Sequence, residues 1–156
     1  MKKLFKVLIF LLLIGMSIAL LFIGNGYNMY KEAIENMPLE EKVEEIRSKE
    51  NYAEFSELPQ MYVNAVISVE DKRFYKHNGI DIIAIGRAAI NDIKAMAYVE
   101  GGSTITQQLA KNMYFTQEKK MERKIAEVFM AWNIESHYSK EDIFELYVNN
   151  IFFGDG

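Results

Sequence analysis

The sequence predicts a mainly α-helical domain that follows a single N-terminal transmembrane helix. Residues 7–23 are an unbroken apolar run, the segments after residue 58 repeat apolar residues at helical spacing, and no segment alternates convincingly at the period of two expected of a strand. The 156 residues are enough for one ordinary domain with a core. The net charge of −4 gives no reason to expect a nucleic-acid partner, and the lack of cysteine excludes disulfides and thiolate metal sites.

The N-terminal segment has the pattern of a membrane anchor. Its most apolar part, Val7 to Ile23, is 17 residues long, and such a helix spans about 25 Å at about 1.5 Å per residue, near the short end for a bilayer. Leu4 and Phe5 extend it. A cleaved signal peptide is the alternative, but residues 20–23 are bulky and no small-x-small cleavage site follows the run. We therefore predict an uncleaved anchor over residues 4–25, with the N-terminus in the cytoplasm because the lysines precede the run.

Residues 26–57 change in composition. Between residues 27 and 57 there are nine glutamates but only four lysines and arginines. A run of charge is usually a solvated face. We predict an acidic juxtamembrane stalk here, or a lid on the domain that follows.

About five helices are predicted in residues 58–156. Pro59 suits the first turn of a helix that continues to about Glu70. Asn78 and Gly79 then mark a turn, and Asp81 can cap a second helix over residues 82–98. These helices would make up the first half of the domain.

Two capping patterns mark later helix starts. Thr104 with Gln107 fits a capping box that opens the third helix, and Ser139 with Asp142 fits one that opens the fifth, over residues 140–150. Residues 118–138 form a long fourth helix between them. The chain ends on a glycine-aspartate turn, which leads us to expect a domain that is incomplete at its C-terminus.

One candidate acid lies on the fourth helix. Glu127 falls nearly opposite the apolar stripe of that helix at about 100° per residue, and Arg123 lies one turn earlier on the same face. The pair could be an ordinary surface ion pair. However, Met130 and Ile134 continue the same face, which is typical of a helix covered on both sides with Glu127 at the edge of a cleft. The stripe consists of Met121, Ile125, Val128, Phe129 and Trp132.

A second acidic pair, Glu70 and Asp71, lies where the first core helix should end. The helix dipole and the apolar neighbours disfavour a further negative charge there, which makes such a carboxylate a better proton acceptor near neutrality. Acids near helix ends are also common without any function. His77 in the same turn is more often a structural residue, and no HxxxH or HxxE spacing supports a zinc site.

Cations gather between the third and fourth predicted helices. They are Lys111, Lys119, Lys120, Arg123 and Lys124. Lysines at a helix N-terminus oppose the helix dipole, which would be explained if an anion such as phosphate bound there. A lysine-rich surface turn is the alternative.

Four motifs give the chain a resemblance to a known family. In order, they are EDKRFYKHNGID, GGSTITQQLAKN, RKIAE and KEDIFELYVNNIFFGDG. They resemble the first four signature motifs of the peptidoglycan glycosyltransferases of glycosyltransferase family 51, which comprise monofunctional transglycosylases and the N-terminal domains of class A penicillin-binding proteins. The resemblance covers residues 58–156, ends within the fourth motif, and implies a lysozyme-like helical glycosyltransferase domain.

The resemblance also implies a reaction and its partners. Lipid II and the growing glycan strand would be the substrates at the outer face of a bacterial cell membrane. An inverting transfer would form β-1,4 bonds and release undecaprenyl pyrophosphate. Other cell-wall synthesis proteins are potential partners. The alternatives are a lysozyme-like hydrolase or lytic transglycosylase, and an inactive membrane-anchored fragment that binds lipid II.

The resemblance assigns a role to each candidate residue. Glu70 would be the general base. Glu127 would assist near the departing pyrophosphate, directly or through a divalent cation, Mg²⁺ or Mn²⁺, with no tightly bound cofactor. Phosphate charge would be neutralised by Lys111, Arg123 and Lys124. Sugar hydroxyls and phosphate oxygens would be bound by Ser103, Thr104, Gln107, Gln108 and Asn112. The turn of the first motif would be shaped by Asp71, Phe74 and His77. The helix over residues 82–98 would rest against the membrane.

Overall fold

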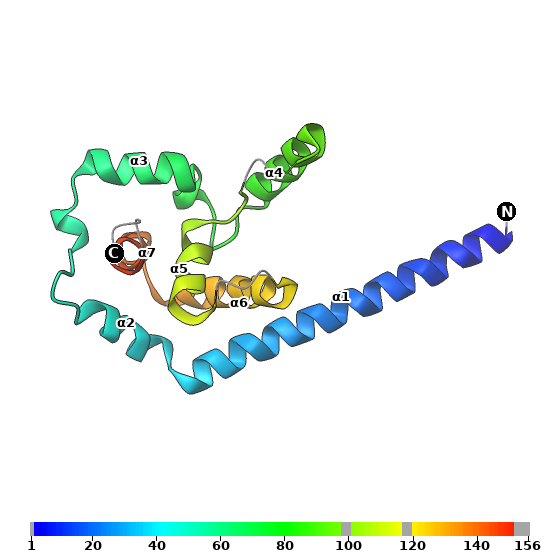
Figure 1. Cartoon of the computed structure of the whole chain (residues 1–156), viewed down its shortest axis with the longest axis horizontal. Helices are drawn as coiled ribbons and strands as arrows, with labels where there is room; N and C mark the ends of the chain where they lie inside the picture. The colour runs from blue at the N-terminus through cyan, green and yellow to red at the C-terminus, as the bar shows by residue number, and fades with distance from the viewer. Residues whose placement is uncertain (1, 98–100, 117–119, 152–156) are drawn as a thin grey trace.

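The computed structural model describes residues 2–97, 101–116 and 120–151. Over this part of the chain there are seven α-helices, two short 3₁₀ helices and no strand, so the prediction of a mainly α fold is confirmed. The elements are α1 (Lys2–Asn36), α2 (Leu39–Arg47), η1 (Phe55–Glu57), α3 (Gln60–Glu70), η2 (Phe74–Lys76), α4 (Ile82–Ala95), α5 (Ile105–Tyr114), α6 (Met121–His137) and α7 (Lys140–Asn150) (Figure 1).

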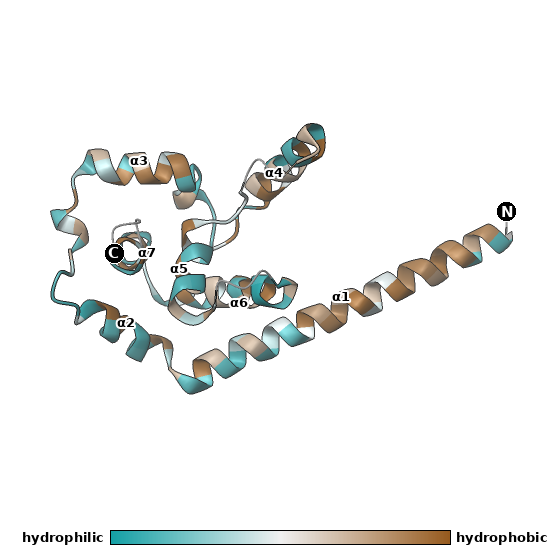
Figure 2. Cartoon of the chain, in the orientation of Figure 1, coloured by the Kyte–Doolittle hydropathy of each residue, from teal (hydrophilic) through white to brown (hydrophobic). Residues whose placement is uncertain are grey.

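The helix α1 is one unbroken rod that extends away from the rest of the molecule (Figure 1). By length and composition it can cross a membrane, and its most apolar window is not buried against the chain. Figure 2 shows this N-terminal part as strongly hydrophobic. The single apolar N-terminal helix is therefore confirmed, and the same helix continues through residues 26–36 beyond the predicted span.

The core lies around α5, which packs between α6 and α7. Its buried side chains include Ile105, Leu109 and Ala110 on α5, Met130 and Ile134 on α6, and Ile143, Phe144 and Leu146 on α7. The apolar face of α2, made of Leu39, Val43 and Ile46, joins the same core. Part of the predicted stalk thus packs on the domain, whereas the division into anchor, stalk and domain stays a prediction.

The predicted caps are present. In α5 the Thr104 hydroxyl accepts from the Gln107 amide N–H, and the Gln107 side chain accepts from the Thr104 N–H, both at 3.1 Å. Ser139 and Asp142 form the same reciprocal cap at α7. Asp81 accepts from the first amides of α4 at 2.9 and 3.0 Å. Short-range hydrogen bonds of this kind satisfy the orphan N–H groups of a helix start.

The helix α4 stands apart from the other helices (Figure 1). It ends at Ala95, and Met96 adopts a left-handed conformation with φ 49°. The predicted continuation of this helix to Tyr98 is wrong at Met96 and Ala97, where the helix has already ended. Tyr98 itself lies outside the described residues, as do Lys119 and the last five residues of the fourth motif. Several of its large apolar side chains are exposed: Ile82, Ile83, Ile85, Ile90 and Ile93.

The segment between α2 and α3 is fastened to α7 by hydrogen bonds to Glu145 and Asn149. Glu145 accepts from the Tyr52 hydroxyl and, at 2.7 Å, from the Phe55 N–H. Asn149 adds bonds to the Ala53 N–H and carbonyl at 2.9 and 2.8 Å. These contacts hold the segment that leads into α3 against α7.

The Tyr52 contact predicts a stability loss at alkaline pH. Burial and then the hydrogen bond to Glu145 raise the pKa of Tyr52 to about 12, against about 10 for a tyrosine in an unfolded chain. The stabilisation is complete below about pH 10 and is lost as the pH rises towards about 12, because only the unfolded state ionises in that window. Across this pH range, the midpoint temperature of thermal unfolding is expected to fall less steeply with pH for Tyr52→Phe than for the wild-type chain. Parallel plots of midpoint against pH would contradict the role of Tyr52.

Candidate active site

Two adjoining hollows lie along α5. The larger one, of about 460 Å³, is bounded by the end of α3, the turn after it, α4 and residues 101–104. The smaller one, of about 190 Å³, lies between α5 and α6. Ser103, Gln108 and Lys111 line both hollows. Glu70 lines the larger hollow and Glu127 the smaller, so the two candidate acids are on either side of a shared wall.

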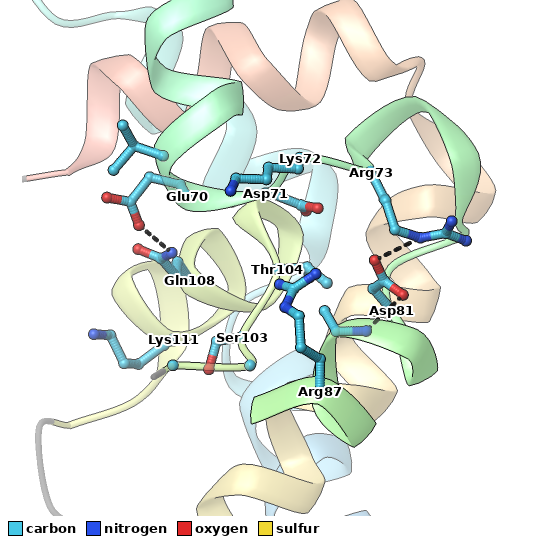
Figure 3. A pocket seen from close by; sticks show the side chains of 14 residues that line it. Glu70, Asp71, Lys72, Arg73, Asp81, Arg87, Ser103, Thr104, Gln108 and Lys111 are labelled. Carbon is cyan, nitrogen blue, oxygen red and sulfur yellow. Dashed lines mark hydrogen bonds and ion pairs between the residues drawn. The ribbon is translucent and has the colours of Figure 1, made fainter. Parts of the chain in front are cut away.

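Glu70 is the last residue of α3 and is exposed in the larger hollow. Its Oε2 accepts from Gln108 Nε2 at 2.9 Å (Figure 3). The Gln108 oxygen in turn accepts from the Tyr147 hydroxyl at 3.3 Å. Burial, followed by the nearby Glu70, raises the pKa of Tyr147. A carboxylate only accepts hydrogen bonds, so Glu70 itself requires the Gln108 NH₂ to face it, and the Tyr147 hydroxyl steadies the other end of the amide.

The first-motif turn is tied to the start of α5 by Asp71. Its carboxylate lies 3.0 Å from His77 Nε2 and accepts from the Ile105 N–H at 3.1 Å. The Thr104 hydroxyl donates to the Gly79 carbonyl at 2.7 Å. Phe74 is fully buried and packs edge-on against His77. This arrangement supports the prediction that Asp71, Phe74 and His77 shape the turn.

Gly79 has a specific reason to be glycine in that turn. Its φ is +85°, in the left-handed region, and an added Cβ would lie 3.2–3.3 Å from the backbone and Cβ of Ala131. A side chain would therefore meet both backbone strain and the α6 surface. The turn can pack closely on α6 because Gly79 has no side chain.

Asp71, His77 and Asp81 are near enough to one another to suggest a metal ion. However, Asp81 caps α4 and pairs with Arg73 at 2.9 Å, and Asp71 is used by His77 and the α5 backbone. A guanidinium beside the group also repels a cation. These residues therefore do not fit a metal site and instead hold the turn together.

Glu127 is buried, with 1% of its side chain exposed. Arg123 Nη1 lies 2.8 Å from Oε1 as an ion pair without an aligned hydrogen bond, and Lys124 Nζ donates to Oε2 at 2.7 Å. Lys124 also donates to the Ser103 hydroxyl at 2.7 Å. Of the two interpretations of Glu127, the buried carboxylate at a cleft is correct. With Lys111 nearby, the smaller hollow carries a net positive charge.

Three of the predicted substrate-binding residues, Thr104, Gln107 and Asn112, are less accessible from the hollows than the others. Thr104 and Gln107 lie in the walls of the hollows but are buried, and their polar groups are used in the α5 cap. Asn112 is on α5 outside the lining of both hollows. The structure thus brings together most of the predicted polar residues but gives these three little direct exposure to a ligand.

Three cations in the larger hollow were missed by the sequence reasoning. Lys72 and Arg73 follow Glu70 and Asp71 directly, and Arg87 reaches from α4 towards Thr104 (Figure 3). Lys72 and Arg73 could have been found, because they lie within the first motif. Arg87 carried no local signal beyond its place in a helix.

Comparisons with known proteins agree with these motifs. A family model described as transglycosylase matches residues 37–156. Penicillin-binding protein 1F of Bacillus subtilis is 52% identical over 101 residues, which are 65% of this chain and 14% of that protein. Penicillin-binding protein 1A of Aquifex aeolicus is 47% identical over 108 residues, 69% of this chain and 15% of that protein. A monofunctional glycosyltransferase of Staphylococcus epidermidis is 45% identical over 116 residues, 72% of this chain and 43% of that protein. The chain thus spans less than half the length of each of these relatives.

Proposed function

We propose that this chain, which belongs to the transglycosylase family of peptidoglycan glycosyltransferases, polymerises glycan strands from lipid II. In this reaction the 4-hydroxyl of one GlcNAc attacks the anomeric carbon of a second substrate. A β-1,4 C–O bond forms, the bond from that carbon to the pyrophosphate oxygen breaks, and undecaprenyl pyrophosphate leaves with the electron pair. The configuration inverts, so no covalent sugar–enzyme intermediate is required.

The observation that carries this proposal is the pair of adjoining hollows with one carboxylate in each. The exposed Glu70 is suited to accept the proton of the attacking hydroxyl. Gln108 holds one oxygen of that carboxylate at 2.9 Å, which fixes its direction. A displacement needs this base on one side and charge stabilisation on the other, and the two hollows supply them separately.

The smaller hollow supports the departure of the pyrophosphate. Lys111, Arg123 and Lys124 offer positive charge to an anionic leaving group, which needs charge stabilisation more than a proton. Glu127 holds Arg123 and Lys124 in place through its two ion pairs. In this proposal the role of Glu127 is to orient the two cations.

The divalent cation expected from the resemblance does not fit at Glu127. Arg123 and Lys124 already lie within 2.8 Å of its two oxygens, and together they carry more positive charge than the carboxylate balances. An additional Mg²⁺ or Mn²⁺ would be repelled there. The proposed reaction therefore includes no metal ion.

The chain is membrane-anchored, and we propose that the N-terminus is cytoplasmic and the domain external. The lysines before the span support this orientation. The exposed apolar side chains of α4, such as Ile82 at 80% and Ile93 at 76%, support the expectation that this helix rests against the membrane. The lipid chain of the substrate would then reach the larger hollow along α4.

Incubation of the purified chain with lipid II in vesicles tests the function. Polymer that a muramidase digests supports the synthase. Shortened strands from mature peptidoglycan would instead indicate the hydrolase. Binding of lipid II without turnover, unchanged in Glu70→Gln, would indicate a binding module and overturn the proposal.

Tyr147→Phe is expected to lower kcat with little change in KM. Removal of the hydroxyl leaves the oxygen of the Gln108 amide without this hydrogen bond, so the amide holds Glu70 less firmly. A hydrogen bond of about 1 kcal/mol corresponds to a roughly fivefold change in rate. Steady-state kinetics on lipid II would measure it, with Tyr62→Phe on α3 as the matched control. An unchanged kcat would show that Tyr147 does not act through Gln108.

A further inference from the structure

Gly26 lies where α1 makes its closest approach to α6. A Cβ added there would lie 2.5 Å from Ile125 Cγ2, 2.6 Å from Ile125 Cβ and 2.9 Å from the Glu122 carbonyl oxygen. These distances are well inside van der Waals contact at about 3.5 Å or more. The Ile125 Cβ and the Glu122 carbonyl belong to or adjoin the backbone of α6, so a rotamer change cannot relieve the overlap. Any side chain at position 26 must push the two helices apart.

Aromatic rings continue this contact beyond Gly26. Tyr27 packs edge-on against Phe129 with ring centroids 5.2 Å apart, and Tyr30 lies 6.1 Å from the same ring. Phe129 in turn packs edge-on against Trp132 at 5.8 Å. The glycine and this cluster dock α1 along α6 over several turns.

The opposite face of α6 carries the charged cluster of the smaller hollow. At about 100° per residue, Arg123 and Glu127 are each about 160° from Ile125 around the helix. The helix α6 is therefore held between α1 on one side and α5 on the other. Because packed helices move as rigid bodies, a displacement at Ile125 must also move Arg123, Lys124 and Glu127.

The docking point lies next to the end of the apolar span. Gly26 follows Ile23 by three residues, about 4.5 Å along the helix at about 1.5 Å per residue. Tyr27 and Trp132 remain 44% and 49% exposed, and these residue types are enriched where a membrane meets water. The contact therefore sets α6 at about the height of the lipid headgroups.

We propose that α1 is a positioning element of the active site and that Gly26 is a positioning residue. Its bare backbone lets α1 dock on Ile125, and the docked helix fixes the Arg123–Lys124–Glu127 cluster at headgroup height, where a lipid-linked diphosphate is presented. The contact between α1 and α6 does not depend on which reaction the chain catalyses. Its effect on the turnover of lipid II rests on the proposed function.

Gly26→Ala, compared with Gly24→Ala, tests the proposal. Gly24 lies on the same helix, and a Cβ there meets nothing within 4 Å. Both changes raise helix propensity alike, so a difference between them isolates the contact with α6. Both variants would be studied as the full chain in phospholipid vesicles, with circular dichroism as the check on helix content.

Trp132 provides a readout that does not depend on activity. It is the one tryptophan in the sequence and lies at the end of the aromatic cluster. Its emission maximum is expected to shift in Gly26→Ala and to match the wild type in Gly24→Ala. Wild-type emission in Gly26→Ala would overturn the docking, whether or not the wild-type chain acts on lipid II.

Turnover of lipid II gives the second readout. Gly26→Ala is expected to lose on the order of a hundredfold in kcat/KM, as when catalytic groups are displaced by about 1 Å, and Gly24→Ala to stay within about twofold of the wild type. If Gly26→Ala loses helix content, Tyr27→Ala can be used in its place. It removes the ring that packs on Phe129 without adding atoms that overlap α6, and it is also expected to lower kcat/KM. A shifted emission with unchanged turnover in either variant would overturn the positioning role while leaving the docking intact. A wild-type chain without turnover would overturn the proposed function instead.

Discussion

Glu70→Gln is expected to abolish glycan polymerisation while the fold stays intact. Glutamine keeps the size of the side chain but cannot accept the proton of the attacking hydroxyl, and general base catalysis contributes about 10² to 10⁴ in rate. The side chain is exposed at the end of α3, so its replacement removes no buried contact. Polymerisation of labelled lipid II measures the loss, and thermal unfolding checks the fold.

The control for this experiment is Glu44→Gln. Glu44 is another exposed glutamate, but it lies on α2 and lines neither hollow. It is expected to leave the rate unchanged. Turnover in Glu70→Gln within tenfold of the wild type would be incompatible with Glu70 as the base.

Glu127→Gln is expected to reduce both activity and stability. The carboxylate is 1% exposed and balances two cations, of which Arg123 is 14% exposed. Without its charge, Arg123 and Lys124 repel each other, and a partly buried guanidinium lacks a counter-ion. We expect a loss of about 2 kcal/mol in the free energy of unfolding and on the order of 10² in kcat.

A double-mutant cycle separates the pairing from the effect of each residue alone. Arg123→Met removes the guanidinium but keeps an unbranched apolar side chain. The free energies of unfolding of Glu127→Gln, Arg123→Met and the double variant then give the coupling between positions 123 and 127. A coupling of about 1 kcal/mol or more is expected. Strictly additive changes would show that the ion pair at 2.8 Å does not hold the cluster together.

The helices and their starts could be predicted because their signals are local. A capping box such as Thr104 with Gln107 depends on residues three apart, and the structure contains it. The apolar run of α1 likewise reports its own length and composition. The candidate acids were found from their positions along the predicted helices, and the motifs, whose order along the chain does not depend on the packing, assigned their roles.

The orientation of individual side chains could not be predicted in the same way. Gln108 lines both hollows, as expected of a residue that meets the substrate, but that its amide is also held between Glu70 and Tyr147, residues 38 and 39 positions away, left no signal in the sequence. Arg87 lines the larger hollow because α4 lies against Gly102, in the segment that precedes α5. Such contacts join helices distant in sequence, and the pattern of a single helix does not say what covers each face.

The sequence by itself determined a membrane helix, a mainly α-helical domain and the two acids that define the candidate chemistry. Only the tertiary structure decided that Glu70 and Glu127 face adjoining hollows, that Glu127 is buried between two cations, and that Gly26 brings the anchor onto α6. The physical reason is the range of the interactions. Helix propensity, capping and hydropathy act over a few residues, whereas burial and ion pairing are fixed only when whole helices pack together.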